Sequence, residues 1–114
     1  MNHILVIDNE ENILKAISNA LLYLGYDVSV AHDGEKGVEL FSKGHNFNLV
    51  ITDINMPRMN GNEVARYIRR SERLDTPIVA ITGLSDDIEE ELFNHSLRKP
   101  FNLKALVDVV KSLT

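Results

Sequence analysis

The segment LVITDINMPRMNG, residues 49–61, passes from an aliphatic run through an aspartate into a loop with proline and glycine. Its aliphatic part, Leu49–Thr52, is too short for a typical helix and is predicted to be a deeply buried strand. A strand without polar alternation is covered on both faces, which is typical of a parallel sheet between helices. Asp53 follows this strand directly, and residues 53–61 form the loop after it.

Strands and helices alternate on both sides of this segment. Further strands are predicted at His3–Asp8, Asp27–Ala31, Pro77–Ile81 and Ser96–Arg98. Apolar residues at helical spacing predict a helix after each strand: residues 13–24, 38–44 ending at Gly44, 64–68, 87–94, and 103–113 after a cap at Asn102. Five such units predict an α/β fold with a parallel sheet and right-handed crossovers. A closed barrel needs roughly twice as many residues, so the sheet is expected to be open and doubly wound.

Length and composition describe one ordinary globular domain, residues 1–114. No apolar run is long enough to span a bilayer, and no signal peptide is recognised. The formal charge of -5 argues against direct binding to nucleic acid, because phosphate backbones attract a basic face. The lack of cysteine excludes disulfides and cysteine-based metal sites, and it fits a cytoplasmic protein that makes no membrane contact.

Polar residues gather where the predicted strands end. Asp8 closes the first strand, Asp53 follows the third, Thr82 follows the fourth, and Lys99 follows the fifth. The carboxyl ends of parallel strands meet at one edge of a sheet, so these side chains are expected to lie together. Close carboxylates repel each other unless a proton or a cation intervenes, and oxygen ligands suit Mg²⁺. An aspartate beside such a cation is a known kind of phosphoryl acceptor.

Each residue also has an ordinary structural interpretation. Asp8 or Asn9 after a strand often caps the next helix. A threonine such as Thr82 favours strands, and a lysine such as Lys99 before proline is usually solvated. The functional interpretation therefore rests on their joint placement at four strand ends.

These residues carry a family resemblance. Residues 4–10 (ILVIDNE), residues 53–61 (DINMPRMNG), Thr82-Gly83 and residues 99–101 (KPF) resemble the receiver domain of two-component response regulators, CheY-like in size, over the whole chain. The resemblance implies a five-stranded parallel sheet of order 2-1-3-4-5, flanked by five helices of which the fourth is shortened here.

By this resemblance, Asp53 is the phospho-acceptor, Thr82 the switch hydroxyl and Lys99 the counter-charge to the phosphoryl group. Mg²⁺ is expected on Asp8, largely through water, on Asp53 and on the backbone carbonyl of Asn55. Asn9 stands where relatives have a second acid that binds the metal directly. A cis peptide bond is expected before the proline that follows Lys99.

The resemblance further implies a partner and a role. The donor is expected to be a phosphohistidine on a sensor histidine kinase or a phosphotransfer protein. The chain is expected to act as a conformational switch or relay on a downstream protein, and the resemblance allows a homodimer. Such a receiver assists its own phosphorylation without being a turnover enzyme. The sequence ends after the last predicted helix, so we expect a free-standing receiver or part of a longer protein.

Three departures from the family pattern stand out. Asn9 removes one negative charge from the metal site, so we expect weaker metal affinity and slower phosphorylation; compensation through water by the neighbouring Glu10 is a hypothesis. Ser96 stands where relatives commonly place a tyrosine or phenylalanine that reports the switch. The stretch from Thr82 to Lys99 is about five residues shorter than usual, which predicts a stubby fourth helix and an altered output surface.

Two other function classes were weighed. Asn9 and Ser96 favour a phosphorylation-independent pseudo-receiver that acts as a protein-interaction module, whereas Asp53, Thr82 and Lys99 argue against it. Enzymes and cofactor proteins of the same architecture would need other motifs after the first strand: a Ser/Thr/Gly-rich loop for FMN, Asp-x-Asp for a haloacid-dehalogenase-type phosphatase, or a glycine-rich dinucleotide loop. The acidic residues at that position disfavour a bound phosphate.

Overall fold

Five parallel strands form one open sheet in the computed structural model, which describes residues 2–43 and 46–114. The strands are β1 (His3–Ile7), β2 (Asp27–Ala31), β3 (Leu49–Asp53), β4 (Ile78–Thr82) and β5 (His95–Arg98). Their order is β2-β1-β3-β4-β5, which confirms the order that the family resemblance implies. The register pairs Ile7 with Thr52 and Asp53 with Ile81, so the central strands end at nearly the same level.

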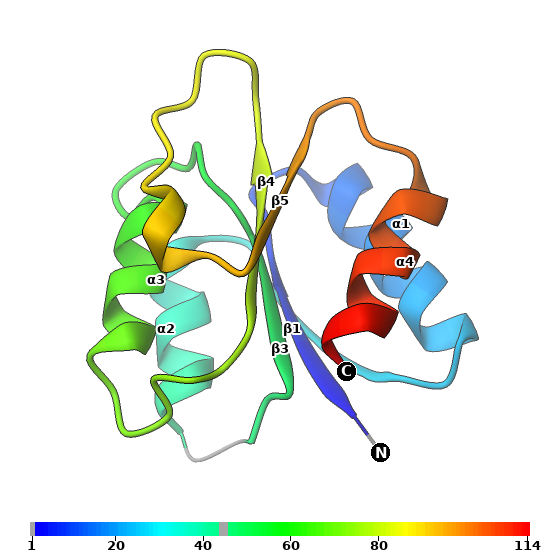
Figure 1. Cartoon of the computed structure of the whole chain (residues 1–114), viewed down its shortest axis with the longest axis horizontal. Helices are drawn as coiled ribbons and strands as arrows, with labels where there is room; N and C mark the ends of the chain where they lie inside the picture. The colour runs from blue at the N-terminus through cyan, green and yellow to red at the C-terminus, as the bar shows by residue number, and fades with distance from the viewer. Residues whose placement is uncertain (1, 44–45) are drawn as a thin grey trace.

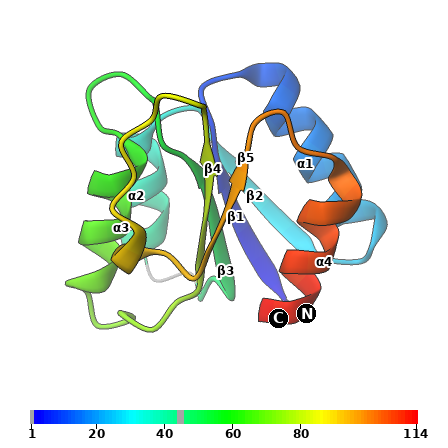
Figure 2. The ribbon, with the colours of Figure 1, turned by 45° about the horizontal axis from the view of Figure 1, so that its top comes forward.

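Helices cover both faces of the sheet (Figure 1). Helices α1 (Glu11–Tyr23) and α4 (Leu103–Leu113) lie on one face, and α2 (Gly34–Ser42) and α3 (Gly61–Arg69) lie on the other (Figures 1 and 2). Gly44, where the second helix was predicted to end, lies outside the described residues.

Alternate residues of the central strands enter two separate hydrophobic cores. Ile4 and Val6 of β1 pack with α1 and α4 residues, whereas Leu5 and Ile7 pack with Phe41 and residues of α3. All four β1 residues are almost completely buried. Side chains of a strand point to opposite faces in turn, so burial on both sides requires an uninterrupted apolar run. This explains why the strands could be recognised from short aliphatic stretches.

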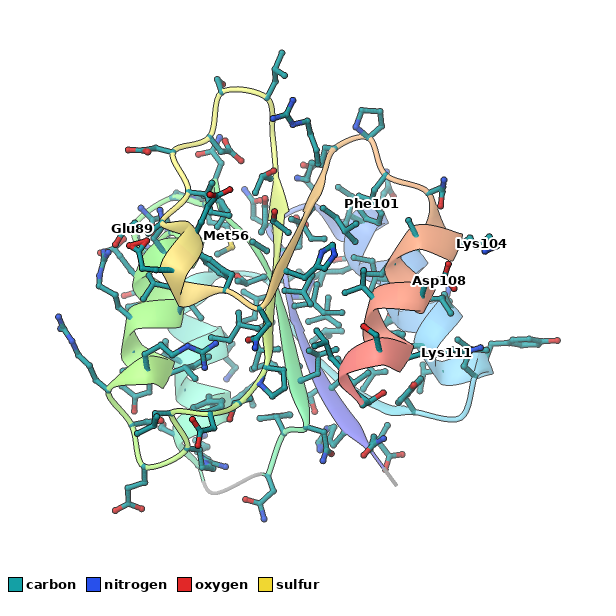
Figure 3. The ribbon with its side chains drawn as sticks, in the orientation of Figure 1. Met56, Glu89, Phe101, Lys104, Asp108 and Lys111 are labelled. Carbon is teal, nitrogen blue, oxygen red and sulfur yellow. The ribbon has the colours of Figure 1, made fainter. Side chains whose placement is uncertain are left out.

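The prediction of a short fourth helix at residues 87–94 was wrong, whereas the helix predicted after it, at residues 103–113, is present. The described residues contain four α-helices and, in this stretch, only a 3-10 turn at Glu90–Leu92. The Asn62 amide of α3 donates to the carbonyl of Asp87 at 2.6 Å and accepts from the N–H of Glu89 at 2.9 Å. Glu89 lies beside α3, where it also pairs with Arg66 (Figure 3). Backbone groups that a helix would use are thus bound to a neighbouring helix instead.

The start of α4 follows an ordinary capping rule. The Asn102 side chain accepts from the N–H of Ala105 at 2.7 Å and caps α4, as predicted. The outer face of α4 is polar, and its Lys104 and Asp108 form an ion pair at 3.2 Å (Figure 3). Among the described residues, no helix has the length and apolar character needed to cross a membrane.

Candidate functional site

The sheet brings the four predicted strand-end residues to one edge. Asp53 ends β3 and Thr82 ends β4, while Asp8 directly follows β1 and Lys99 directly follows β5. These four strands are consecutive neighbours in the sheet. The Asp8, Asp53 and Thr82 residues are 1%, 2% and 8% exposed, so three polar groups are buried at the end of an aliphatic sheet.

Lys99 connects the end of β5 to the acidic residues. Its Nζ lies 3.3 Å from Asp53 Oδ1 and 3.2 Å from Glu10 Oε1. Its backbone N–H donates to the carbonyl oxygen of Thr82 at 2.7 Å, and its peptide bond to Pro100 is cis, as expected. The ammonium group is therefore shared between the predicted phospho-acceptor and Glu10, the acid that follows Asn9 in the sequence.

Burial and neighbouring charges shift the pKa values of Asp8, Asp53 and Lys99. Burial raises the pKa of Asp8 to about 6; the hydrogen bond from the Glu10 backbone opposes this rise, and the Asp53 charge adds to it. Burial also raises the pKa of Asp53, against the opposing effect of Lys99. Burial lowers the pKa of Lys99, but the charges of Asp53 and Asp8 outweigh it and the net shift is upward. Two carboxylates here resist ionisation unless more positive charge arrives.

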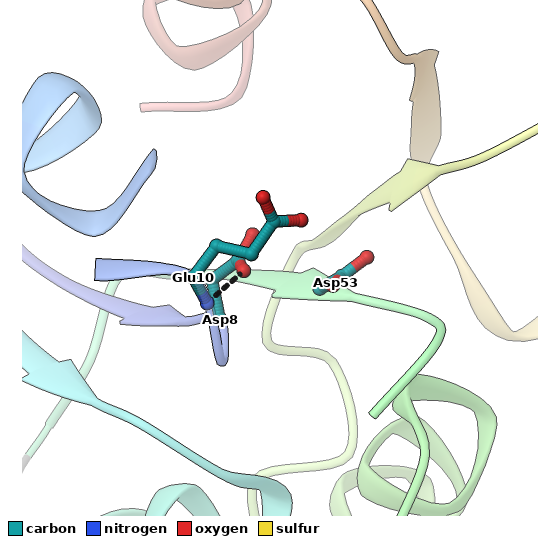
Figure 4. Close-up of side chains that lie close together, drawn as sticks. All are labelled: Asp8, Glu10 and Asp53. Carbon is teal, nitrogen blue, oxygen red and sulfur yellow. Dashed lines mark hydrogen bonds between the residues drawn. The ribbon is translucent and has the colours of Figure 1, made fainter. Parts of the chain in front are cut away.

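Carboxylate oxygens converge in a geometry suited to a hard cation. One oxygen each from Asp8, Glu10 and Asp53 lies within 4.8 Å of the others (Figure 4). Asp8 Oδ1 accepts a hydrogen bond from the Glu10 N–H at 2.8 Å, shown as a dashed line in Figure 4. Within the described residues, the buried Asp8 Oδ2 has no hydrogen-bond partner. An unpaired buried carboxylate oxygen is costly, and a cation would satisfy it.

The other two predicted metal positions are placed differently. Asn55 is exposed in the loop after β3 and lines a cavity of about 250 Å³ together with Ile54 and Asp86. Asn9 is exposed, and it does not cap α1, whose N-cap residue is Glu10. Glu10 supplies an oxygen to the acidic cluster.

The loop from Asp53 to α3 is fixed by close backbone contact. The N–H of Gly61 donates to the carbonyl of Ile54 at 2.9 Å. A Cβ atom at Gly61 would overlap the carbonyl oxygen of Asp53, so only glycine permits this approach. Asn60 and Glu63 form a reciprocal capping box at the start of α3. Helix α3 is thereby anchored directly against the backbone of the candidate acceptor.

Two further features of this edge were not predicted from the sequence. The N–H of Gly83, directly after Thr82, donates to Asp86 Oδ2 at 2.5 Å. Asp86 also contributes to the raised pKa of Asp53, after the larger effects of burial and Lys99. Ser96, a departure from the family pattern already evident in the sequence, is exposed on β5.

Comparison with known proteins identifies the family. The family described as "Response regulator receiver domain" matches residues 4–111. A probable transcriptional regulator, ycf27, of Cyanidium caldarium is 37% identical over 78% of this chain and 34% of its own length. The ycf27 protein of Porphyridium aerugineum is 35% identical over 96% of this chain and 47% of its own length. The chain thus spans no more than about half the length of these curated relatives.

Solved structures agree with this assignment. The response regulator TrrA of Thermotoga maritima, solved in complex with Mg²⁺–BeF, is 36% identical and has a TM-score of 0.88, with 100% of both chains covered. TrrA has also been solved in complex with the histidine kinase ThkA; there it is 35% identical with a TM-score of 0.86, over 99% of this chain and 98% of that one. The fold, the strand-end residues and these comparisons establish that this chain belongs to the response regulator receiver domains of two-component signalling.

Proposed function

We propose that this chain accepts a phosphoryl group on Asp53 in a Mg²⁺-dependent transfer from a phosphohistidine, and that it switches conformation as a result. The observation that carries the proposal is the setting of the Asp53 carboxylate. It is buried, lies 3.3 Å from the Lys99 ammonium, and shares a cluster of oxygens with Asp8. Such a site is arranged to receive a group that carries more negative charge.

The transfer replaces one covalent bond with another. A carboxylate oxygen of Asp53 attacks phosphorus in line, the new O–P bond forms and the P–N bond breaks. The departing imidazole keeps the electron pair of the broken bond and leaves neutral when its other nitrogen carries a proton. Lys99 stays charged and faces the equatorial oxygens of the transferred group. Thr82, at the end of the neighbouring strand, offers a hydroxyl to the same group.

The residues present fit a Mg²⁺ ion. Asp8, Asp53 and the backbone carbonyl of Asn55 would hold it, and the unpartnered Asp8 Oδ2 supports this choice. When bound, Mg²⁺ offsets the charge of the acids and of the phosphoryl oxygens. The site then tolerates two ionised carboxylates despite the burial that raises their pKa values.

The proposed partners follow from the family. A sensor histidine kinase or a phosphotransfer protein supplies the phosphoryl group, and the TrrA–ThkA complex supports this class of donor. The phosphorylated chain acts on a downstream protein, or on a second copy of itself. It takes part in its own phosphorylation and dephosphorylation, without turnover of a separate substrate.

A pseudo-receiver is the second candidate. Asn9 carries no charge, and Ser96 cannot act as an aromatic reporter of the switch, which favours an interaction module that ignores phosphorylation. The buried Asp53–Lys99 pair has no evident use in such a module. The two functions therefore differ in whether Asp53 can take a phosphoryl-like ligand.

Beryllofluoride, a mimic of the aspartyl phosphoryl group, separates the two candidates. The ¹⁵N-labelled chain is titrated with it, with and without Mg²⁺, while the amide signals of Thr82 and Gly83 are followed by NMR. We expect Mg²⁺-dependent saturation in the natural sequence and none in Asp53→Asn. Unchanged spectra of the folded natural chain at millimolar Mg²⁺ would favour the pseudo-receiver.

A further inference from the structure

Glu10 has a position that the family pattern does not assign to the metal. We propose that Glu10 supplies the acidic metal ligand that this chain lacks at Asn9, and that metal binding draws Glu10 away from Lys99. This inference rests on the proposed cation site, but not on phosphoryl transfer. By this proposal, Glu10 couples cation binding to the position of the Lys99 ammonium, which faces Asp53.

The first support is the geometry of the oxygens. A Glu10 oxygen lies within 4.8 Å of one oxygen from Asp8 and one from Asp53. Two ligands of a single Mg²⁺ stand at most about 4.2 Å apart, because each Mg–O distance is about 2.1 Å. A small rotation of the exposed Glu10 side chain closes this difference. Figure 4 shows the Glu10 carboxylate reaching over Asp8 on the side of Asp53.

The second support is the unpartnered oxygen beneath Glu10. Asp8 is 1% exposed, and its Oδ2 has no hydrogen-bond partner among the described residues. Its other oxygen accepts from the Glu10 backbone N–H, and this contact fixes where the Glu10 side chain leaves the main chain. The same turn leaves Asn9 exposed. The local backbone therefore brings position 10 toward the cluster.

The third support is that the Glu10 side chain makes no capping hydrogen bond to its own helix, although Glu10 is the N-cap residue of α1. An N-cap side chain usually binds the first free N–H groups of the helix. The Glu10 carboxylate instead points at Lys99, 3.2 Å away.

Lys99 gives Glu10 its second function. The ammonium is shared almost equally by Glu10 and Asp53, at 3.2 and 3.3 Å. A dication attracts a carboxylate more strongly than a single ammonium does at the same distance. When Glu10 turns to the cation, Lys99 loses one of its two ion pairs and keeps the one with Asp53. Cation binding thus leaves both the cation and the Lys99 ammonium available to the incoming phosphoryl oxygens.

Calorimetric titration with Mn²⁺, and separately with Mg²⁺, tests this inference without any phosphoryl donor. Glu10→Gln keeps the shape of the side chain and removes its charge, and we expect the dissociation constant to rise about tenfold, which corresponds to 1.4 kcal/mol. Asp8→Asn is the positive control and should weaken binding at least as much. Two control variants remove acids outside the cluster. Glu11→Gln removes the acid that pairs with Lys15 and His32, and Asp108→Asn removes the acid that pairs with Lys104 on α4.

The outcomes separate a ligand from a general electrostatic effect. A loss confined to Glu10→Gln and Asp8→Asn, with less than twofold change in both controls, supports the inference. We also expect Asn9→Asp to restore the affinity of Glu10→Gln, because it returns one carboxylate to the site. Equal losses in Glu10→Gln and the controls, or no loss in Glu10→Gln while Asp8→Asn is impaired, would overturn the role of Glu10. Absence of cation binding in the natural chain would overturn the cation site itself.

Discussion

At the scale of single residues, burial in this site opposes the ionisation of its acidic side chains. Asp8 and Asp53 lie at the end of an aliphatic sheet, where burial penalises their ionised forms. Lys99 compensates only partly, since it is also shared with Glu10. The folded protein thus retains an electrostatic cost that a cation would relieve. This cost has a measurable effect on stability.

The stability of the metal-free protein should fall as the pH rises from about 4 to about 6. The pKa of Asp8 is raised to about 6 in the folded chain, against about 4 for an unfolded aspartate. The folded state therefore binds more protons than the unfolded state in this window, and the free energy of unfolding decreases with pH. The full effect of this residue is at most about 3 kcal/mol.

Urea denaturation in EDTA across this pH range measures the effect. Asp8→Asn preserves the hydrogen bond from Glu10 and removes the titration, so its stability should depend less steeply on pH. The raised pKa of Asp53 leaves a residual slope in that variant. Identical pH profiles for the two proteins would show that Asp8 is not protonated in this window.

At the scale of elements, the stretch between β4 and β5 differs most from its prediction. Three side chains on one face of α3 hold it: Asn62 binds Asp87 and Glu89, Arg66 pairs with Glu89, and Arg69 donates to the carbonyl of Leu92 at 3.0 Å. Where a helix was predicted at residues 87–94, these contacts hold a strap of residues 87–92 against α3. The strap begins directly after Asp86, whose carboxylate binds the Gly83 N–H beside Thr82. The same segment of chain therefore contacts α3 and leads into the candidate phosphoryl site.

Asn62→Ala should loosen this strap without removing the fold. It deletes two hydrogen bonds from a side chain that is 6% exposed, and the loss of stability should be about 1–3 kcal/mol. Hydrogen exchange should accelerate at the Glu89 amide, while the β1 and β3 amides keep their relative protection. Asn19→Ala, on the exposed face of α1, is the matched control and should change neither quantity. Unchanged exchange at Glu89 in Asn62→Ala would show that the Asn62 contacts do not hold the strap.

At the scale of the whole molecule, the sequence was sufficient where structure depends on local patterns. Continuous aliphatic runs such as residues 4–7 and 49–52 predicted the strands, because both of their faces are buried. The strand order could not come from such patterns and followed only from the family resemblance. The helix at residues 87–94 was mispredicted because its backbone binds the side chain of Asn62, which lies 25 residues away from Asp87 in the sequence.

The site shows the same division between local and long-range information. The sequence correctly predicted that Asp8, Asp53 and Lys99 lie at one edge of the sheet, because the carboxyl ends of parallel strands lie together. The sequence predicted for Glu10 only a possible water-mediated role beside Asn9; its contact with Lys99 and the acidic cluster depends on a turn fixed by one backbone hydrogen bond. Asp86 was missed because its effect on Asp53 depends on a local turn that returns its carboxylate to the Gly83 N–H.

Intact-mass analysis after incubation with acetyl phosphate tests the central proposal most directly. The natural chain and Asp53→Asn are each treated with and without Mg²⁺, and phosphohistidine on a donor protein replaces acetyl phosphate in a parallel reaction. We expect a single phosphoryl adduct on the natural chain, formed only with Mg²⁺, and none on Asp53→Asn. A full adduct on Asp53→Asn would contradict Asp53 as the acceptor, and no adduct from either donor would contradict phosphoryl transfer to this chain.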